Sequence, residues 1–331
     1  MVEGEYPVSG FEGVCVISNS RAEAGPLESV IAAMPGCYVV KFNSDGQSPA
    51  GAMSQAMTYF TAIYTVQKPK LVVVLGDRYE TLAAALAAMF LKIPVAHIHG
   101  GETTTGAFDD SMRHAMTHIA ELHFCATGEA MEKISDMTGY TGQAVNKGVS
   151  IVGAPGLDGI EGNSAKRDRK MILVTYHPET RLADNGLSGL VEMCKALKEF
   201  DSYDITFTGV NNDPGCEEFR RQITLFCFHS SKKVVRENLT HKEYIVLMQH
   251  AALVIGNSSA GVIEAPWVGC PSINLGNRQT GRPMAPSVFH SVDDIGKALM
   301  WVKEWKPIYK GCAAPKIAKV IKDWLDARSP T

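Results

Sequence analysis

Short runs of apolar, often β-branched residues alternate along the first half of the chain with longer segments that have the periodicity of helices. The apolar runs predict strands, buried on both faces, at residues 14–18, 38–42, 71–75, 94–98 and 122–125. The segments between and after them predict helices at residues 27–33, 50–66, 79–91, 110–120 and 129–137. This strict β/α alternation predicts a parallel, doubly wound sheet.

A second series of the same kind follows a connecting stretch at residues 153–168 that is rich in Gly, Asp, Asn and Ser. Strands are predicted at residues 171–175, 205–208, 233–235, 253–255 and 272–275, and helices at 187–200, 217–228, 242–250 and 260–268. The fold class is therefore α/β, with two Rossmann-like doubly wound domains that face a cleft. We place the domains at residues 1–157 and 158–312, with a C-terminal helix at about 313–331 packing back on the first domain.

Polar clusters directly follow six of the predicted strands. In open parallel sheets ligands bind beyond the carboxyl ends of the strands, so all six clusters are expected to line one cleft. The clusters are Ser18-Asn-Ser-Arg21, Gly76-Asp-Arg78, His97-Ile-His-Gly-Gly-Glu102, Tyr176-His-Pro-Glu179, Gly209-Val-Asn-Asn-Asp213 and Gly256-Asn-Ser-Ser259.

The segment from Gly256 to Gly261 joins an apolar strand to a helix through small residues and presents backbone N–H groups and hydroxyls where phosphate is stabilised. The alternative is an ordinary N-cap, with Asn257 or Ser258 serving only the helix. Glu264 favours the interpretation of this segment as part of a nucleotide-binding site over that of an ordinary N-cap. A carboxylate in an otherwise apolar helix is costly unless a group such as a ribose diol hydrogen-bonds to it.

Three basic or ionisable residues could complete a diphosphate site. Arg21 follows the first strand, and its planar guanidinium suits phosphoryl oxygens, although a surface ion pair with Glu23 is the alternative. His177 follows the first strand of the second domain, and Arg282 ends the glycine-containing loop that begins at Gly276.

Acidic residues gather in the first domain. Asp77 and Glu102 follow strands, and Asp109 and Asp110 open the helix that carries Arg113. One of the aspartates could be an N-cap. The set as a whole predicts acid–base chemistry, because converging carboxylates raise one another's pKa and so provide a base and an acid near neutral pH.

A metal site is the weaker interpretation of the histidines in this region. His97 and His99 share a strand face, and His114 and His118 share a helix face, but the pairs lie on separate elements and no HExxH signature is present. We expect neither a metal nor another cofactor.

The amino-acid composition limits the classes of partner that the protein is expected to bind. The 331 residues are 45% hydrophobic and 20% charged with a formal charge of −3, which argues against a nucleic-acid-binding or membrane-binding surface. No apolar run approaches the roughly 20 residues of a membrane span, and the first ten residues lack the features of a signal peptide, so we expect a cytoplasmic protein. The eight cysteines are scattered, which favours reduced thiols over a disulfide scaffold.

Motifs along nearly the whole chain resemble those of the hydrolysing UDP-N-acetylglucosamine 2-epimerases, which supply N-acetylmannosamine or related sugars for sialic-acid-type biosynthesis. The most specific are His97-Ile-His-Gly-Gly-Glu102 and Asp109-Asp-Ser-Met-Arg-His114. The others are Ser20-Arg-Ala-Glu23, Leu75-Gly-Asp-Arg-Tyr-Glu80, Thr175-Tyr-His-Pro178, Asn211-Asn-Asp213, Gly256-Asn-Ser-Ser259 with Glu264, and Gly276-Asn-Arg-Gln-Thr-Gly-Arg282.

The resemblance implies a GT-B-like fold, a UDP-sugar substrate and a homodimer or larger homo-oligomer. It implies elimination of UDP through a 2-acetamidoglycal, followed by addition of water and return of a proton to the opposite face of C2. It assigns Asp77, Glu102 and one of Asp109 or Asp110 to the sugar. The implied UDP ligands are Arg21, His177, Ser258, Ser259, Arg282, the ribose ligand Glu264 and the nearby Asn211. Arg78 and Arg113 are further candidates for substrate binding, and His177 counts among the catalytic candidates.

The chain departs from the family pattern after its second strand. The family carries a longer segment there with a histidine that serves the site, whereas residues 41–47 of this chain run straight into Pro49. This departure makes an inactive nucleotide-sugar binding protein one alternative. A non-hydrolysing UDP-sugar 2-epimerase and a GT-B glycosyltransferase are the other two. The substrate is either UDP-N-acetylglucosamine or a 2,4-diacetamido-trideoxy relative.

Overall fold

The computed structural model describes residues 10–44, 47–140, 148–166, 170–228, 230–302 and 305–328, without the side chains of Arg21 and Ala22. The chain folds into two compact units. Unit 1 contains Met1–Glu102, Asp109–Gly159 and Lys310–Thr331, and unit 2 contains Thr103–Phe108 and Ile160–Tyr309. Each unit is described by itself below.

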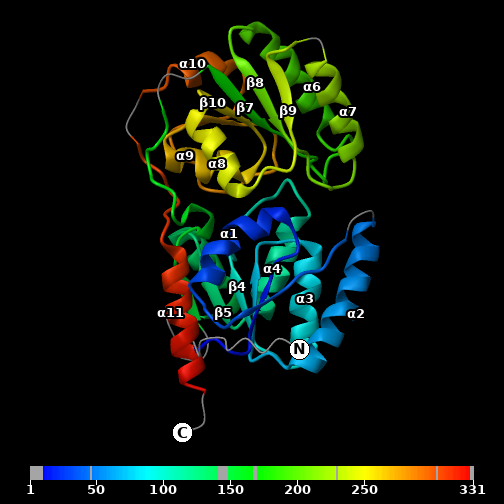
Figure 1. The fold of residues 1–331 in the computed structure, drawn as a ribbon, viewed down its shortest axis with the longest axis vertical. Helices are drawn as coiled ribbons and strands as arrows, with labels where there is room; N and C mark the ends of the chain where they lie inside the picture. The colour runs from blue at the N-terminus through cyan, green and yellow to red at the C-terminus, as the bar shows by residue number, and fades with distance from the viewer. Residues whose placement is uncertain are drawn as a thin grey trace, which may run out of the picture. The chain divides into compact units, whose positions relative to one another are not determined.

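Unit 1 is built on a six-stranded parallel sheet with the strand order β2-β1-β3-β4-β5-β6 (Figure 1). Its strands are β1 (Val14–Ile17), β2 (Tyr38–Val40), β3 (Leu71–Leu75), β4 (Val95–Ile98), β5 (Leu122–Cys125) and β6 (Gly148–Ile151). Its helices are α1 (Arg21–Ala32), α2 (Pro49–Gln67), α3 (Tyr79–Phe90), α4 (Asp109–Ile119), α5 (Gly128–Thr138), the 3-10 turn η1 (Pro155–Leu157) and α11 (Ala313–Asp326).

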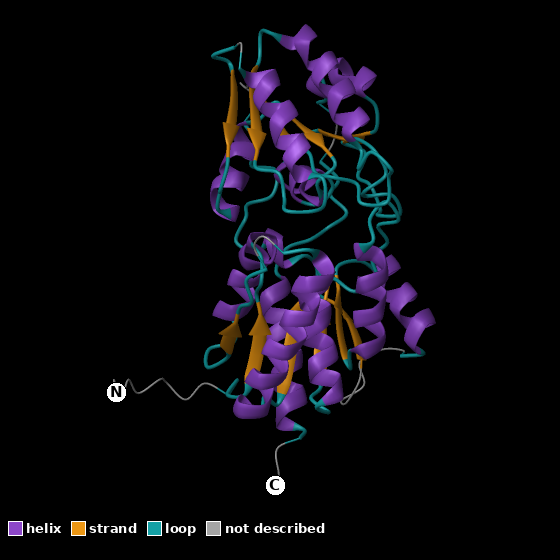
Figure 2. Cartoon of the chain, turned by 90° about the vertical axis from the view of Figure 1, so that its right-hand side faces the viewer, coloured by secondary structure: helices purple, strands orange, loops and turns teal. Residues whose placement is uncertain are grey.

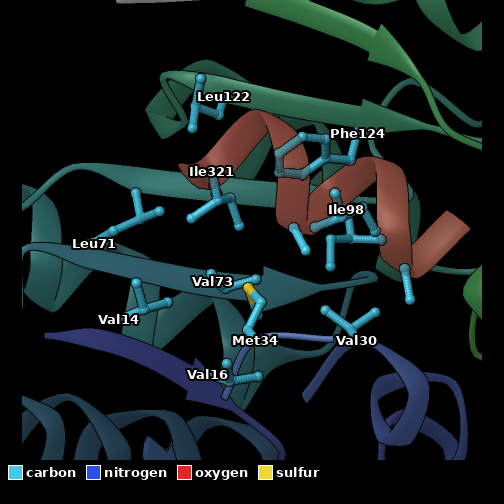
Figure 3. Close-up of a cluster of buried hydrophobic side chains, with 14 of the residues drawn as sticks. Val14, Val16, Val30, Met34, Leu71, Val73, Ile98, Leu122, Phe124 and Ile321 are labelled. Atoms are coloured by element: carbon cyan, nitrogen blue, oxygen red, sulfur yellow. The ribbon is translucent and has the colours of Figure 1, made fainter. Parts of the chain in front are cut away.

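Side chains from alternate positions of the unit 1 strands form cores on both faces of the sheet. Val14 and Val16 of β1 belong to the core covered by α1 and α11, whereas Cys15 and Ile17 belong to the core covered by α2 and α3. Figure 3 shows Ile321 of α11 among side chains of the first core. Most positions of the strands are apolar, because helices cover both faces of the sheet.

Unit 2 repeats this architecture with a six-stranded parallel sheet in the order β12-β11-β10-β7-β8-β9, and Figure 2 shows helices flanking the strands. The strands are β7 (Met171–Thr175), β8 (Asp204–Thr208), β9 (Lys233–Arg236), β10 (Leu253–Gly256), β11 (Ser272–Asn274) and β12 (Val288–Phe289). The helical elements are α6 (Leu187–Ala196), η2 (Leu197–Phe200), α7 (Cys216–Cys227), α8 (His241–His250), η3 (Ser259–Gly261), α9 (Glu264–Val268), η4 (Val292–Asp294) and α10 (Ile295–Leu299).

The order of strands in each sheet determines where a ligand site is expected. In unit 2 the connections run outward in both directions from β7 and β10, which are paired through Ile255 and Val174. In unit 1 the same reversal lies between β1 and β3. Ligands of doubly wound sheets bind at such switch points, beyond the carboxyl ends of the strands. The α/β class with two doubly wound parallel sheets is thus confirmed.

Several predicted elements need correction. Strands β6 and β12 were not predicted. Helix α1 begins at Arg21 rather than at residue 27, because Ser20 and Glu23 form a capping box and Pro26 is accommodated inside the helix. The helix predicted at residues 260–268 is a 3-10 turn followed by a short α9 that begins at Glu264. Pro266 explains this break, because a helix begun at residue 260 would need its missing N–H, whereas the first turn of a helix tolerates proline.

Two further features bear on the sequence-based expectations. None of the described helices is both long and apolar enough to span a bilayer. All eight cysteines lie in the described ranges, and each is a free thiol there.

Candidate functional site

The switch point of unit 2 is spanned by two residues that follow β7 and β10. Asn257 is fully buried; its Oδ1 accepts a hydrogen bond from the backbone N–H of His177 at 2.8 Å, and its Nδ2 donates to the carbonyl of His177 at 2.7 Å. Gly256 precedes Asn257 with a φ of +148°, and a Cβ at this position would overlap the carbonyl of Thr175. Glycine is therefore required where the two strand ends approach each other.

His177 is a neutral hydrogen-bond donor in this environment. Its Nδ1 accepts from the backbone N–H of Asn211 at 3.3 Å, so the ring proton lies on Nε2. Burial, together with the positive charge of Arg278, lowers the pKa of His177 to about 3. Asn211 donates in turn to Asp213, which also accepts from Arg278 at 3.4 Å. The structure thus brings two candidates, His177 and Asn211, into direct contact.

The loop from Gly276 to Arg282 is held by a buried carboxylate. Glu179 is 1% exposed and accepts a hydrogen bond from the backbone N–H of Asn277 at 2.9 Å. Gly276 has a φ of +68°, and a Cβ there would overlap the carboxylate of Glu179. Gln279 donates to the carbonyl of Asn257 at 3.0 Å, which connects the loop to the switch point. Arg282, at the end of the loop, is partly buried.

Sequence reasoning did not assign a role to Glu179 or Arg278. Both lie in segments that it singled out, Glu179 in the segment Tyr176–Glu179 that follows β7 and Arg278 in the loop that ends at Arg282. A carboxylate in the short segment after a buried strand was the available signal, because such a group requires a compensating donor when it is buried.

The segment Thr103–Phe108 belongs to unit 2 although residues on both sides of it belong to unit 1. The backbone N–H of Thr105 donates to the carbonyl of Thr280 at 3.1 Å, and Arg181 donates to the carbonyl of Thr105 at 2.8 Å. Gly106 lies so close to Asn277 that a Cβ would overlap the Asn277 carbonyl. The loop that carries Arg282 is thereby fixed to the segment whose ends continue into Glu102 and Asp109.

The remaining candidates of unit 2 follow β10. The hydroxyl of Ser258 accepts from the N–H of Ala260 at 3.4 Å and so caps the turn η3, which begins at Ser259. This contact is the N-cap that was the alternative to a phosphate site. The two functions are compatible, but η3 is a single turn and lacks the dipole of a long helix. Glu264 begins α9, and its side chain is 13% exposed.

The carboxylates of unit 1 are organised by Arg113, which is 1% exposed. Its guanidinium forms ion pairs with Asp77, which follows β3, and with Asp110, at 3.3 Å. It also donates to the backbone carbonyl of Glu102 at 3.1 Å. Arg113 was expected to contact the substrate, but its described contacts are with these acids, so the role that they support is positioning.

Two histidines extend this group of acids. His99 has a φ of +63° and places Nδ1 3.2 Å from Oε1 of the buried Glu102. His114 lies with Nε2 3.5 Å from Asp110, and its pKa is lowered chiefly by burial. Asp109, the first residue of α4, is partly buried.

His97 connects two parts of the same region. It is fully buried, and its Nε2 lies 2.8 Å from the carbonyl of Gly76, which precedes Asp77. Its Nδ1 lies 3.4 Å from the hydroxyl of Thr117, which donates to the carbonyl of Arg113 at 3.0 Å. Burial lowers the pKa of His97 to about 3, so the ring is neutral. No cluster of three potential metal ligands exists within the described ranges.

Two arginine candidates lie near the switch point of unit 1. Arg78 forms a bidentate ion pair with Glu80, in which both N–O distances are 3.2 Å. Arg21 is the first residue of α1, and its side chain lies outside the described part of the chain. Residues 45–46 of the short segment after β2, which departs from the family pattern, are also outside the description.

The chemistry of the two units is complementary. Unit 1 offers acids held by one guanidinium and histidines beside them, which suit proton transfer. Unit 2 offers a neutral imidazole N–H, serine hydroxyls and a carboxylate near a switch point, which suit a nucleotide.

Comparison with known proteins identifies the family of the chain. The sequence matches the family described as UDP-N-acetylglucosamine 2-epimerase over residues 37–322. It is 31% identical, over 77% of this chain and 69% of the relative, to the GDP/UDP-N,N'-diacetylbacillosamine 2-epimerase (hydrolyzing) of Campylobacter jejuni. It is 30% identical to a polysialic acid biosynthesis protein of Escherichia coli, over 84% of this chain and 76% of the relative. Its fold resembles that of the Methanocaldococcus jannaschii UDP-GlcNAc 2-epimerase solved with UDP-GlcNAc and UDP, with a TM-score of 0.77, 20% identity and coverage of 93% and 99% of the two chains.

Proposed function

The chain belongs to the UDP-N-acetylglucosamine 2-epimerase family, and from this membership we propose that it is a hydrolysing 2-epimerase. The proposed substrates are UDP-N-acetylglucosamine, or a relative modified at C4, and water. The products are UDP and the free C2 epimer, an N-acetylmannosamine-type sugar. Similarity to a polysialic acid biosynthesis protein supports a role in supplying sialic-acid-type sugars.

The observation that carries the proposal is the arrangement of acids around Arg113. Asp77 and Asp110 pair with one buried guanidinium, which also donates a hydrogen bond to the backbone carbonyl of Glu102. Nucleotide binding alone does not require such a set, whereas removal and return of a proton at C2 requires groups that act as base and acid. Arg113 offsets the mutual repulsion of the carboxylates and holds them in place.

The diphosphate and ribose are assigned to unit 2. His177 presents an N–H to a phosphoryl oxygen without adding a charge, and Arg282, Ser258 and Ser259 supply further donors. Glu264 accepts from the ribose. Because negative charge on the diphosphate grows as the C1–O bond breaks, donors at this position stabilise the transition state more than the bound substrate.

The proposed reaction proceeds in two stages. A carboxylate of unit 1 takes the proton from C2, and the electron pair of the C2–H bond forms a double bond between C1 and C2. The C1–O bond breaks, and its electron pair leaves with UDP. The sugar thereby becomes a 2-acetamidoglycal. Water then adds its oxygen to C1, and a proton is delivered to the opposite face of C2. UDP does not return to the sugar, which separates this reaction from that of a non-hydrolysing epimerase.

The motif His97-Ile-His-Gly-Gly-Glu102 supports the hydrolysing branch, since the non-hydrolysing branch carries a Glu-Ala-Gly-Leu-Arg type of sequence at this position. The relative from Campylobacter jejuni, whose name includes "hydrolyzing", supports the same branch.

The proposal is tested by incubating the protein with UDP-N-acetylglucosamine, and separately with UDP-N,N'-diacetylbacillosamine, in D2O. NMR should show free UDP and a free 2-epimerised sugar with deuterium at C2. A UDP-bound epimer without free sugar would indicate the non-hydrolysing reaction. Retention of the C2 proton in the product would contradict the elimination mechanism.

A further inference from the structure

His241 and Glu264 are the first residues of two helices in unit 2 and approach each other there. His241 begins α8 and Glu264 begins α9, and the His241 Nε2 lies 3.9 Å from the Glu264 Oε1. Their side chains are 22% and 13% exposed. The separation is too long for a direct hydrogen bond but is within the range of a group that contacts both.

Both side chains have a buried polar atom without a hydrogen-bond partner among the described residues. These atoms are Nε2 of His241 and Oε2 of Glu264. Buried polar atoms in native proteins are nearly always paired with protein, water or ligand, because an unpaired one carries a desolvation cost. A hydroxyl group fits the two, since it can accept a hydrogen bond from an imidazole N–H and donate one to a carboxylate.

The surroundings fix His241 in place. Thr240 and Glu243 form a capping box in which the Glu243 carboxylate accepts from the Thr240 N–H at 2.8 Å, while the Thr240 hydroxyl accepts from the Glu243 N–H at 3.2 Å. One turn further along α8, the Tyr244 hydroxyl lies 3.1 Å from the hydroxyl of Thr175, the last residue of β7. The start of α8 is thereby held beside the strand end at the switch point, where a nucleotide is expected.

We propose that His241 and Glu264 together bind the ribose diol of the nucleotide, with His241 Nε2 donating to one hydroxyl and the Glu264 carboxylate accepting from the diol. This inference rests on the proposed function and adds His241 as a residue that selects ribonucleotides. One hydroxyl that contacts both residues satisfies both unpaired atoms, whereas a sugar without hydroxyls leaves them buried and unpaired.

The test measures binding of UDP and of 2′,3′-dideoxy-UDP by calorimetry to the wild type and to His241→Phe. The wild type should prefer UDP by more than tenfold. His241→Phe should weaken UDP binding by about tenfold, the effect of one lost hydrogen bond to a partner, and leave dideoxy-UDP binding unchanged. His241→Gln retains an N–H donor and should recover most of the UDP affinity.

The matched control is His250→Phe, the same replacement at the exposed last residue of α8, which should bind both nucleotides as the wild type does. The inference is overturned if His241→Phe binds UDP normally, if it loses both nucleotides equally, or if the wild type does not distinguish them. Failure of the wild type to bind UDP at all would instead overturn the proposed function, on which the inference rests. Thermal melting of each variant shows whether a loss of UDP affinity comes from unfolding. If His241→Phe is unfolded, the UDP affinity of His241→Gln decides whether the inference holds.

Discussion

His177 and Asn257 are joined by two hydrogen bonds, 2.8 and 2.7 Å long, in which one side-chain amide satisfies both the N–H and the carbonyl of the histidine backbone. The contact connects the residues that follow β7 and β10. Asn257 is fully buried, so its side-chain amide is shielded from bulk solvent. The direction of the imidazole is therefore set by the strand ends and not by a flexible loop.

We expect Asn257→Leu to destabilise the protein, because the side chain keeps its approximate shape but leaves two buried backbone groups unpaired. Each such group costs about 1–3 kcal/mol, so the free energy of unfolding should fall by about 2–6 kcal/mol. Urea unfolding measures this change. Asn212→Leu, at an exposed neighbour of the same region, should change the stability little. Equal losses in the two variants would show that the buried contact is not the cause.

Asp77→Asn should separate chemistry from nucleotide binding. The amide keeps the size of the side chain but cannot act as a base, so turnover should fall by a factor on the order of 10²–10⁴ while the affinity for UDP stays nearly unchanged. Steady-state assays and calorimetry with UDP provide the two measurements. Asp136→Asn, on the exposed part of α5, is the control. Loss of UDP binding with normal turnover at saturation would contradict the assigned division of labour.

Glu264→Gln should produce the reverse pattern. Replacing the carboxylate weakens a charge-assisted hydrogen bond to the ribose that is typically worth about 1.5–3 kcal/mol, so UDP affinity should drop by about 10- to 150-fold. Calorimetry tests this loss, with the exposed Glu199→Gln as control. An unchanged dissociation constant for UDP would remove Glu264 from the nucleotide site.

Gly106→Ala should disturb the acids without altering any of them. The new Cβ would overlap the Asn277 carbonyl and displace the segment Thr103–Phe108, whose neighbours in the chain are Glu102 and Asp109. A displacement of about 1 Å in reacting groups can lower turnover by roughly 10²-fold. Gly296→Ala adds a methyl group where no atom lies within 4 Å and should behave as the wild type. Normal turnover in Gly106→Ala would show that this segment does not position the acids.

His123→Phe should reduce the dependence of stability on pH. His123 is buried in β5, and burial lowers its pKa from 6.5 to about 4. Between these values the unfolded chain binds a proton that the folded chain does not, so the stability contribution is full above pH 6.5 and is lost as the pH falls towards 4. The slope is at most about 1.4 kcal/mol per pH unit for one histidine.

Urea unfolding at pH 7, 6 and 5 tests this prediction. The wild type should lose stability faster on acidification than His123→Phe does, whereas the exposed His250→Phe should follow the wild type. Parallel curves for His123→Phe and the wild type would assign the pH dependence to other groups, such as His97 and His177, whose pKa values are also lowered by burial.

The sequence predicted the framework better than the details that depend on distant contacts. The largely apolar strands β3, β5 and β7 were predicted with the bounds that the structure has. Strand β6 contains Gly148 and Ser150 and has no such run, so periodicity could not identify it. The short α9 follows from Pro266, a local signal that the helical pattern around it obscured.

The features of the candidate site also fall into those that the sequence could predict and those that depend on distant contacts. The positions of Asp77, His177 and Asn257 after strands could be predicted, because the edge of a parallel sheet is a property of the pattern. The burial of Arg113 among acids could not, since it depends on how α4 packs beside β3 and β4. The approach of His241 to Glu264 likewise depends on the packing of α8 against α9, which no local pattern encodes.

The position of α11 in unit 1 has a consequence for biosynthesis on the ribosome. Ile317 and Ile321 of this helix belong to the core that contains Val73, Ile98 and Phe124, and Figure 3 shows Ile321 there. Yet α11 is translated only after all of unit 2. Until then the nascent chain carries an uncovered apolar face on the first sheet, and exposed apolar faces of incomplete chains are prone to aggregation. Chaperone demand should therefore last until α11 has been translated, and a stop codon placed before Ala313 should yield a product that proteases remove.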